Sequence, residues 1–149
     1  MKPDGKPIYL NDAYFDILGL TREEFAEAEK KGLGWGDQIH PDDAQLVGEA
    51  WRNLAEFGVP LNLEYRINKP WRSYDSATDT EMTGPTWLQG TAIAEMGEDG
   101  RPIAVQGFVT EISLKKFSEK LLAQRLEDAL ETKQAADRFI DMVLLLFHL

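Results

Sequence analysis

Residues 86–113 decide how the rest of this chain is organised. They read TWLQGTAIAE, then MGEDGRP, then IAVQGFVTEIS. The two outer segments are apolar and long enough for strands, and Asp99-Gly100 between them marks a tight turn. Directly after the second segment the pattern becomes helical and stays so almost to the end. The stretch predicts a hairpin that continues into a long helix, which could pass movement of a sheet to whatever follows.

Composition narrows the class of protein. With 149 residues, 43% of them hydrophobic, the chain is expected to form one domain with an appended element. The absence of cysteine excludes disulfides, thiolate metal sites and a cysteinyl-flavin adduct. No apolar segment follows Met1 as in a signal peptide, and the apolar run 143–147 is far shorter than the roughly 20 residues of a membrane span. These features predict a soluble cytoplasmic protein without a membrane partner.

The net charge of −10 is unevenly distributed. Basic and acidic residues are equal in number from Ser113 onward, so the whole deficit lies in residues 1–112. An acidic body repels phosphate backbones, which argues against nucleic acid as a partner. The neutral helix can meet a copy of itself without charge repulsion.

Turn and capping signals predict the elements of the body. Asn11 caps one helix, Thr21 and Glu24 form a capping box for a second, and Pro41 begins a third. Residues 69–85 are polar, contain two prolines and predict a loop. The expected order is a strand at 8–10, helices at 12–18, 21–31 and 41–57, and strands at 61–67, 86–96 and 103–112. This order predicts an α+β domain with an antiparallel sheet and the helices on one face. The partner of the strand at 8–10 would precede Met1, so an N-terminal edge strand is expected to be missing.

The body resembles a PAS/PAC domain of the type found in sensor histidine kinases. The resemblance rests on Trp35 followed by the HPDD segment 40–43, on Tyr65-Arg66-Ile67, and on Thr86-Trp87-Leu88. The closing segment 107–113, GFVTEIS, resembles the strand end of that family. The resemblance covers about residues 3 to 113 and implies a PAS fold for residues 1–113.

The tail carries a second resemblance. Residues 125–142 resemble the helix that enters the phosphoacceptor domain of fungal-type hybrid histidine kinases. In that family a phosphoacceptor box follows, whereas here the chain continues VLLLFHL to Leu149. Residues 114–149 are therefore expected to be a signalling helix truncated before that box. Because the phosphoacceptor and ATP-binding motifs are absent, we expect no enzymatic activity from this chain.

Two histidines and a pair of acids are candidates for chemical sites. His40 could bind a metal or haem, but a cap or buried polar contact before Pro41 is favoured. His148 lacks the adjacent acid of a phosphoacceptor, so we interpret it as incidental. Asp42 and Asp43 suit the positive end of a helix dipole better than acid–base work. No metal site is predicted.

The resemblance implies signal transmission at the strand-to-helix junction. Glu111 is expected to bond a backbone or basic group there. The residues predicted for transmission are Trp87, Gly107, Glu111, Ile112 and Ser113.

Aromatic residues of the body could line a ligand pocket, as PAS domains hold flavin, haem or small metabolites between helices and sheet. The alternative, which we favour, is that they fill the core and that no cofactor is bound. They are Tyr9, Phe15, Trp35, Trp51, Tyr65, Trp87 and Phe108.

Helical spacing in the tail predicts a coiled-coil seam. The seam residues recur at alternating spacings of four and three, which is typical of a homodimer. The alternative is a helix that folds back on its own body. The seam consists of Leu122, Leu126, Ala129, Lys133, Ala136, Ile140 and Val143.

The leading hypothesis is a non-enzymatic PAS sensory and dimerisation module that signals to the kinase domain of the intact protein in a two-component phosphorelay. The alternative is a ligand-binding protein that holds haem or a small apolar metabolite.

Overall fold

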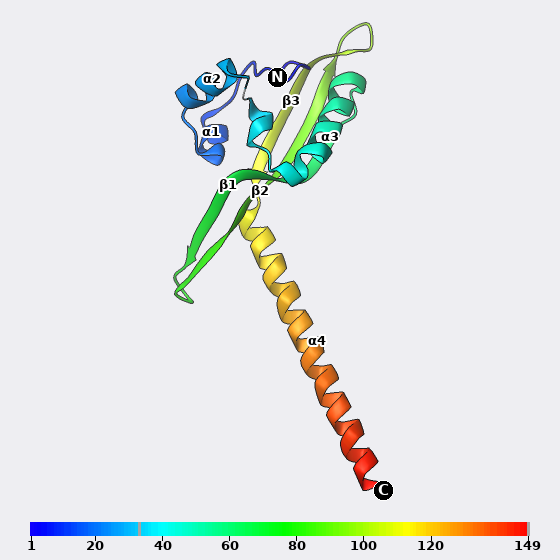
Figure 1. Cartoon of the computed structure of the whole chain (residues 1–149). Coiled ribbons are helices and arrows are strands. Elements are labelled where there is room, and N and C mark those ends of the chain that lie inside the picture. Colours follow the sequence, from blue (N-terminus) through cyan, green and yellow to red (C-terminus); the bar gives the residue numbers. More distant parts are fainter. Residues whose placement is uncertain (33, 149) are drawn as a thin grey trace. The chain divides into compact units, whose positions relative to one another are not determined.

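The computed structural model describes residues 1–32 and 34–148 and contains two compact units, Met1–Ser113 and Leu114–Leu149. The first unit holds a three-stranded antiparallel sheet in the order β1-β2-β3 (Figure 1). Its strands are β1 at Leu61–Asp75, β2 at Thr80–Met96 and β3 at Pro102–Glu111. With the helices described below, this arrangement confirms the predicted α+β class.

Two short helices precede the sheet, and their ends follow from local chemistry. The Asn11 side chain accepts the Tyr14 N–H and begins α1, Asp12–Leu18. Thr21 and Glu24 form the predicted capping box of α2, Arg22–Lys30. Both helix starts are therefore confirmed as predicted.

The third predicted helix begins with a tighter turn. A 3₁₀ helix, η1, spans Trp35–Gln38, and a second, η2, spans Pro41–Asp43 directly before α3 at Ala44–Phe57. Gly58 ends α3 in the left-handed conformation, with φ of 71°. The helical segment 41–57 is confirmed, but its first turn is 3₁₀ rather than α.

The helices pack on one face of the sheet through two buried clusters. Leu61, Tyr65 and Ile67 alternate along β1 and point to this face, as the strand periodicity predicted. One cluster joins α1, α2 and the start of α3 to the sheet and consists of Phe15, Leu18, Phe25, Ile39, Val47, Tyr65, Ile67 and Leu88. The other joins α3 to β1 and β3 and consists of Leu54, Leu61 and Val105.

The strand predicted at residues 8–10 is wrong. Those residues belong to no strand, and Tyr9 is exposed. The backbone of Met1 instead exchanges two hydrogen bonds with Val105, each of 2.7 Å, on the outer edge of β3. A pair of bonds between two residues is the antiparallel pattern.

The loop predicted at residues 69–85 is also wrong. β1 and β2 continue as a hairpin arm, which we define as Pro70–Asp75 paired with Thr80–Pro85 (Figure 1). The two prolines that suggested a loop face each other across the arm, next to a register shift between Ile67 and Pro70. Proline is tolerated at strand edges and irregularities, which the arm provides.

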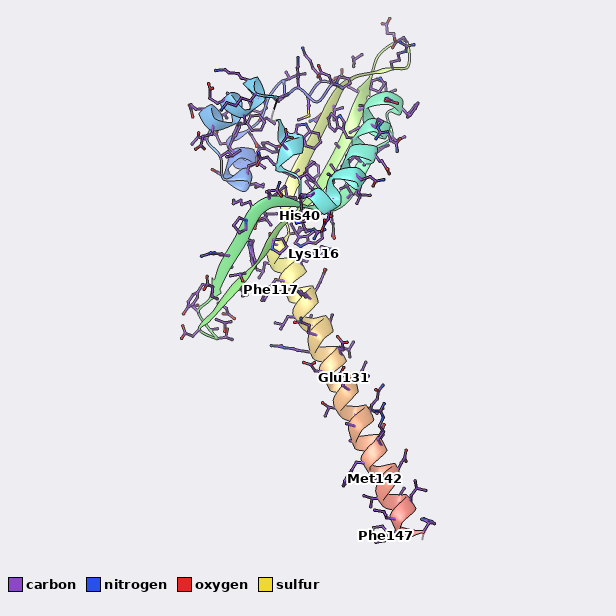
Figure 2. All side chains as sticks on the ribbon, viewed as in Figure 1. His40, Lys116, Phe117, Glu131, Met142 and Phe147 are labelled. Carbon is purple, nitrogen blue, oxygen red and sulfur yellow. The ribbon has the colours of Figure 1, made fainter. Side chains whose placement is uncertain are left out.

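The second unit is helical. Ser113–Phe147 form one α-helix, α4, whose side chains project from it along its length, as the labels Glu131, Met142 and Phe147 show (Figure 2). Among the described residues no helix is long and apolar enough to cross a membrane.

Candidate functional site

The two residues that follow β3 are bonded to a single residue of β2, Trp87. The Trp87 carbonyl accepts the Ile112 N–H at 2.8 Å, and the Trp87 N–H donates to Ser113 Oγ at 3.0 Å. Ser113 is 2% exposed and is the first residue of α4. The point where strand becomes helix is therefore held by both backbone groups of one β2 residue.

Arg66 lies beside Trp87 and connects it to a third element. Arg66 on β1 is the register partner of Trp87, and its guanidinium lies 5.2 Å from the centroid of the Trp87 ring. On its other side Arg66 binds Asp43, the last residue before α3. Its Nε and Nη2 donate to the Asp43 carboxylate at 2.9 and 2.7 Å, and its backbone N–H donates to the same carboxylate at 2.7 Å.

This contact has the features of a strong ion pair. Two of its three bonds are the parallel bonds of a bidentate arginine–carboxylate pair. The side chains of Arg66 and Asp43 are 26% and 13% exposed, so water screens them only in part. Hydrogen bonding to Arg66 lowers the pKa of Asp43 below its usual range. Asp43 is therefore held as a carboxylate at neutral pH.

His40 and Asp42 lie beside this pair and have the structural roles expected for them. His40 Nδ1 accepts the Asp42 N–H at 3.2 Å, so His40 caps the turn that leads into α3 (Figure 2). The Asp42 carboxylate lies 3.8 Å from Arg66 Nη2. The described residues contain no group of three metal-binding side chains.

Glu111 does not make the bond expected for it. Its side chain is exposed and has no hydrogen bond or ion pair among the described residues. Its register partner on β2 is Leu88, an apolar residue. Ser113 and Trp87 supply the fastening that was predicted for Glu111.

Gly107, another residue predicted for transmission, allows β3 to lie close to β2. A Cβ atom at this position would lie 2.6 Å from the Thr91 carbonyl oxygen and 2.8 Å from the Ala92 side chain. Only glycine fits that spacing without a shift of backbone.

The aromatic residues predicted for a pocket separate into two groups. Phe15 and Tyr65 are buried in the core, and Trp35 and Trp51 meet edge to face with centroids 5.0 Å apart. Tyr9 and Phe108 are 76% and 67% exposed, so the prediction that they line an interior pocket is wrong. Phe108 lies on the face of the sheet away from the helices, because its register partner Thr91 alternates with inward-facing residues.

Comparison with known proteins gives the family of this arrangement. The PAS fold family model matches residues 7–75. The chain contains a PAS domain. It is 28% identical over 88 residues to y4lL, an uncharacterized protein of Sinorhizobium fredii, and spans 9% of the length of that curated relative.

Solved structures agree on the fold of the PAS domain. A domain of a Haloarcula marismortui protein described as a light and redox sensing histidine kinase is 21% identical, with a TM-score of 0.55, over 76% of this chain and 85% of that one. A sensory box histidine kinase/response regulator of Burkholderia thailandensis gives 21% identity and a TM-score of 0.59 over 83% and 81%. The N-terminal domain of a diguanylate cyclase with PAS/PAC sensor from Marinobacter aquaeolei gives 20% and 0.52 over 73% and 86%.

The interior of the PAS domain holds polar groups as well as rings. Burial raises the pKa of Tyr65 to about 12 and also raises that of Tyr14. Thr86 is 1% exposed, and its hydroxyl has no hydrogen-bond partner among the described residues. Two open surface hollows of the described residues lie elsewhere. One, of about 480 Å³, is on α4, and one, of about 380 Å³, is on the hairpin arm.

The seam predicted on α4 is exposed on this single chain. Leu122, Leu126 and Ile140 are more than half exposed, and only Val143 of the seam is partly covered. His148 Nδ1 lies 2.8 Å from the Leu144 carbonyl oxygen, one turn earlier in α4. The dimer through this seam stays a prediction.

Sequence reasoning missed the pairing of Asp43 with Arg66. Each residue belongs to a sequence motif of its own, and Arg66 lies 23 residues after Asp43, on the strand that follows α3. It also missed Lys69, whose Nζ donates to the Asp16 and Ile17 carbonyl oxygens at 3.3 and 2.9 Å and so binds the end of α1.

Proposed function

We propose that this chain is a non-enzymatic PAS sensory and dimerisation module that passes a signal through β3 and α4 to a histidine kinase domain of the intact protein. The observation that carries the proposal is the direct step from strand to helix. β3 ends at Glu111 and α4 begins at Ser113, so only Ile112 lies between them. A shift of β3 therefore has no flexible loop in which to dissipate.

The exposed seam on α4 supports a second copy of the chain as the first partner. A surface helix with Leu122, Leu126 and Ile140 on one stripe gains stability when that stripe is covered. Lys133 and the two seam alanines weaken the seam. A seam of moderate strength can change its packing when the sheet moves, whereas a very stable seam resists such a change.

The kinase as the receiver of the signal is supported by resemblance. Two of the similar structures belong to proteins described as histidine kinases, and the third belongs to a diguanylate cyclase. The curated relative is far longer than this chain, which suits a module of a larger protein. The fungal-type origin of the tail and the phosphorelay are part of the same proposal.

A fusion of the full chain to the catalytic half of a histidine kinase tests the proposal. One residue inserted between Glu119 and Lys120 turns the following helix by about 100°, whereas an insertion of about seven residues restores the seam. We expect kinase autophosphorylation to change with the single insertion and to stay near the parent level with the heptad. Equal activity of both insertions, with dimers intact, would overturn the proposal.

We propose as a second candidate that the PAS interior binds a small molecule. The unpartnered Thr86 hydroxyl favours it, because a buried polar group without a partner is costly unless something satisfies it. The proposed ligand is haem or a small apolar metabolite. An absorbance spectrum and a native mass of the purified chain test this candidate. A bound chromophore or added mass would support it, and their absence in freshly purified protein would count against it.

A further inference from the structure

The strand-to-helix junction is connected, through contacts of side chains, to the residue that precedes α3. The side chain of Glu111, at the junction itself, has no hydrogen bond or ion pair among the described residues. The ion pair of Asp43 with Arg66 is connected to this junction through Trp87. Arg66 touches the Trp87 ring, and Trp87 holds both Ile112 and Ser113. A continuous set of contacts therefore runs from Asp43 through Arg66 and Trp87 to the two residues of the junction.

We infer that the pair Asp43–Arg66 couples the start of α3 to the end of β3. Asp43 directly precedes α3, so displacement of α3 moves its carboxylate. The inference deepens the proposed function, on which it rests, by naming the residues that lead into the transmitting junction. It assigns Asp43 and Arg66 as positioning residues that act through Trp87.

The contacts of Arg66 indicate how a change at Asp43 reaches Trp87. Arg66 binds Asp43 through its side chain and its backbone N–H, so the carboxylate fixes both the guanidinium and the β1 backbone. Because Arg66 is only 26% exposed, loss of Asp43 leaves a partly desolvated charge. The guanidinium is then expected to move away from the Trp87 ring and toward solvent. Trp87, which bonds to Ile112 and Ser113, thereby loses the contact between its ring and Arg66.

Packing gives α3 a means to move the pair. Val47 and Leu54 of α3 are 2% and 0% exposed and contact the two core clusters that include residues of all three strands. A ligand or partner that shifts this helix on the sheet changes the position of its first residues. The His40 N–H donates to the Arg66 carbonyl oxygen at 2.9 Å, and Ile39 forms a bridge to Ile67, so the segment before α3 is attached to β1. Displacement of α3 is therefore expected to act on Arg66.

Amide hydrogen exchange on the full chain tests the inference without any kinase. We expect Asp43→Asn to speed exchange of the Ile112 amide by about tenfold relative to that of the Val105 amide. Val105 lies on β3, far from the Asp43–Arg66 pair along the strand, and its N–H donates to the Met1 carbonyl oxygen. Glu111→Gln is the matched control, since it removes the same charge next to the measured amide and should leave exchange unchanged. Arg66→Lys keeps the charge but loses the bidentate contact and should give an intermediate rate.

Three results would overturn the inference. They are equal Ile112 exchange in Asp43→Asn and Glu111→Gln, equal acceleration of Ile112 and Val105, and parent-like exchange in Arg66→Lys. If Asp43→Asn does not fold, Arg66→Lys carries the test alone. In the kinase fusion Asp43→Asn should change autophosphorylation and Glu111→Gln should not. A fusion insensitive to the single-residue insertion refutes the proposed function, whereas the exchange result judges the coupling by itself.

Discussion

Ser113 Oγ accepts the backbone N–H of Trp87 at 3.0 Å, so the first side chain of α4 completes the hydrogen bonding of β2. At this position β3 no longer supplies a ladder partner, because its last paired residue, Glu111, lies opposite Leu88. A side chain therefore replaces a backbone carbonyl where strand pairing ends. The replacement lets the chain turn into a helix without leaving a buried N–H group unpaired.

Ser113→Ala should destabilise the PAS domain by about 1–3 kcal/mol, because the Trp87 N–H loses its acceptor in a buried site. Urea denaturation of the full chain measures the change. Ser118→Ala is the control, since Ser118 is an exposed residue of the same helix. A loss at Ser113 no larger than that at Ser118 would show that the hydrogen bond contributes nothing.

The Asp43–Arg66 pair should make stability depend on pH. The folded pKa of Asp43 is lowered, so its stabilising effect is present above the unfolded pKa of about 3.9 and is lost as the pH falls toward the folded value. Asp43→Asn should cost about 2–3 kcal/mol at neutral pH. The gap between the parent and this variant should then narrow as the pH drops below about 4.

Urea denaturation of both proteins across this pH range tests the prediction. Asp12→Asn is the control, because Asp12 pairs with Arg22 at 2.6 Å but its side chain is 87% exposed. An exposed pair contributes little, so its removal should change stability hardly at all. A gap for Asp43 that stays constant with pH would contradict the assigned cause.

Thr86→Val should leave stability unchanged or raise it by up to about 1 kcal/mol. The change replaces a hydroxyl that has no partner with a methyl group of similar size in a fully buried site. Thr86→Ser, which keeps the hydroxyl and removes the methyl, should destabilise the domain. Thermal unfolding compares the two, and a destabilised valine variant would mean that the hydroxyl is bonded in solution.

Gly107→Ala should destabilise the domain by about 1–3 kcal/mol through overpacking. Its Cβ would lie 2.6 Å from the Thr91 carbonyl oxygen, so the β2–β3 pairing has to open. Gly84→Ala is the matched control, because Gly84 is also a strand residue and nothing lies within 4 Å of its Cβ. Similar unfolding midpoints for the two variants would contradict the close approach.

The features predicted correctly from the sequence are those set by near neighbours in the chain. The capping box of Thr21 and Glu24 needs only residues three apart, and the alternation along Leu61–Ile67 shows itself within one strand. The hairpin arm was missed because Trp71 pairs with Gly84 across the chain, and nothing in either segment alone shows that pairing.

The candidate site was predicted in part for the same reason. Ser113 was identified from its place in a motif, yet its bond joins it to Trp87, 26 residues earlier. Asp43 and Arg66 are 23 residues apart, and only the folded sheet brings them together. The role predicted for Glu111 failed because a motif gives the position of a carboxylate but not the side chains around it.

Lys133→Leu should strengthen a dimer formed through α4. Lys133 is the charged residue on the stripe that includes Leu126 and Ile140, so leucine there adds apolar area at the centre of the predicted seam. We expect the dimer dissociation constant to fall about tenfold or more, as sedimentation equilibrium measures it. Lys120→Leu is the matched control, because the same change lies on the opposite side of the helix. Equal effects of the two substitutions would indicate general hydrophobic association and would contradict the seam.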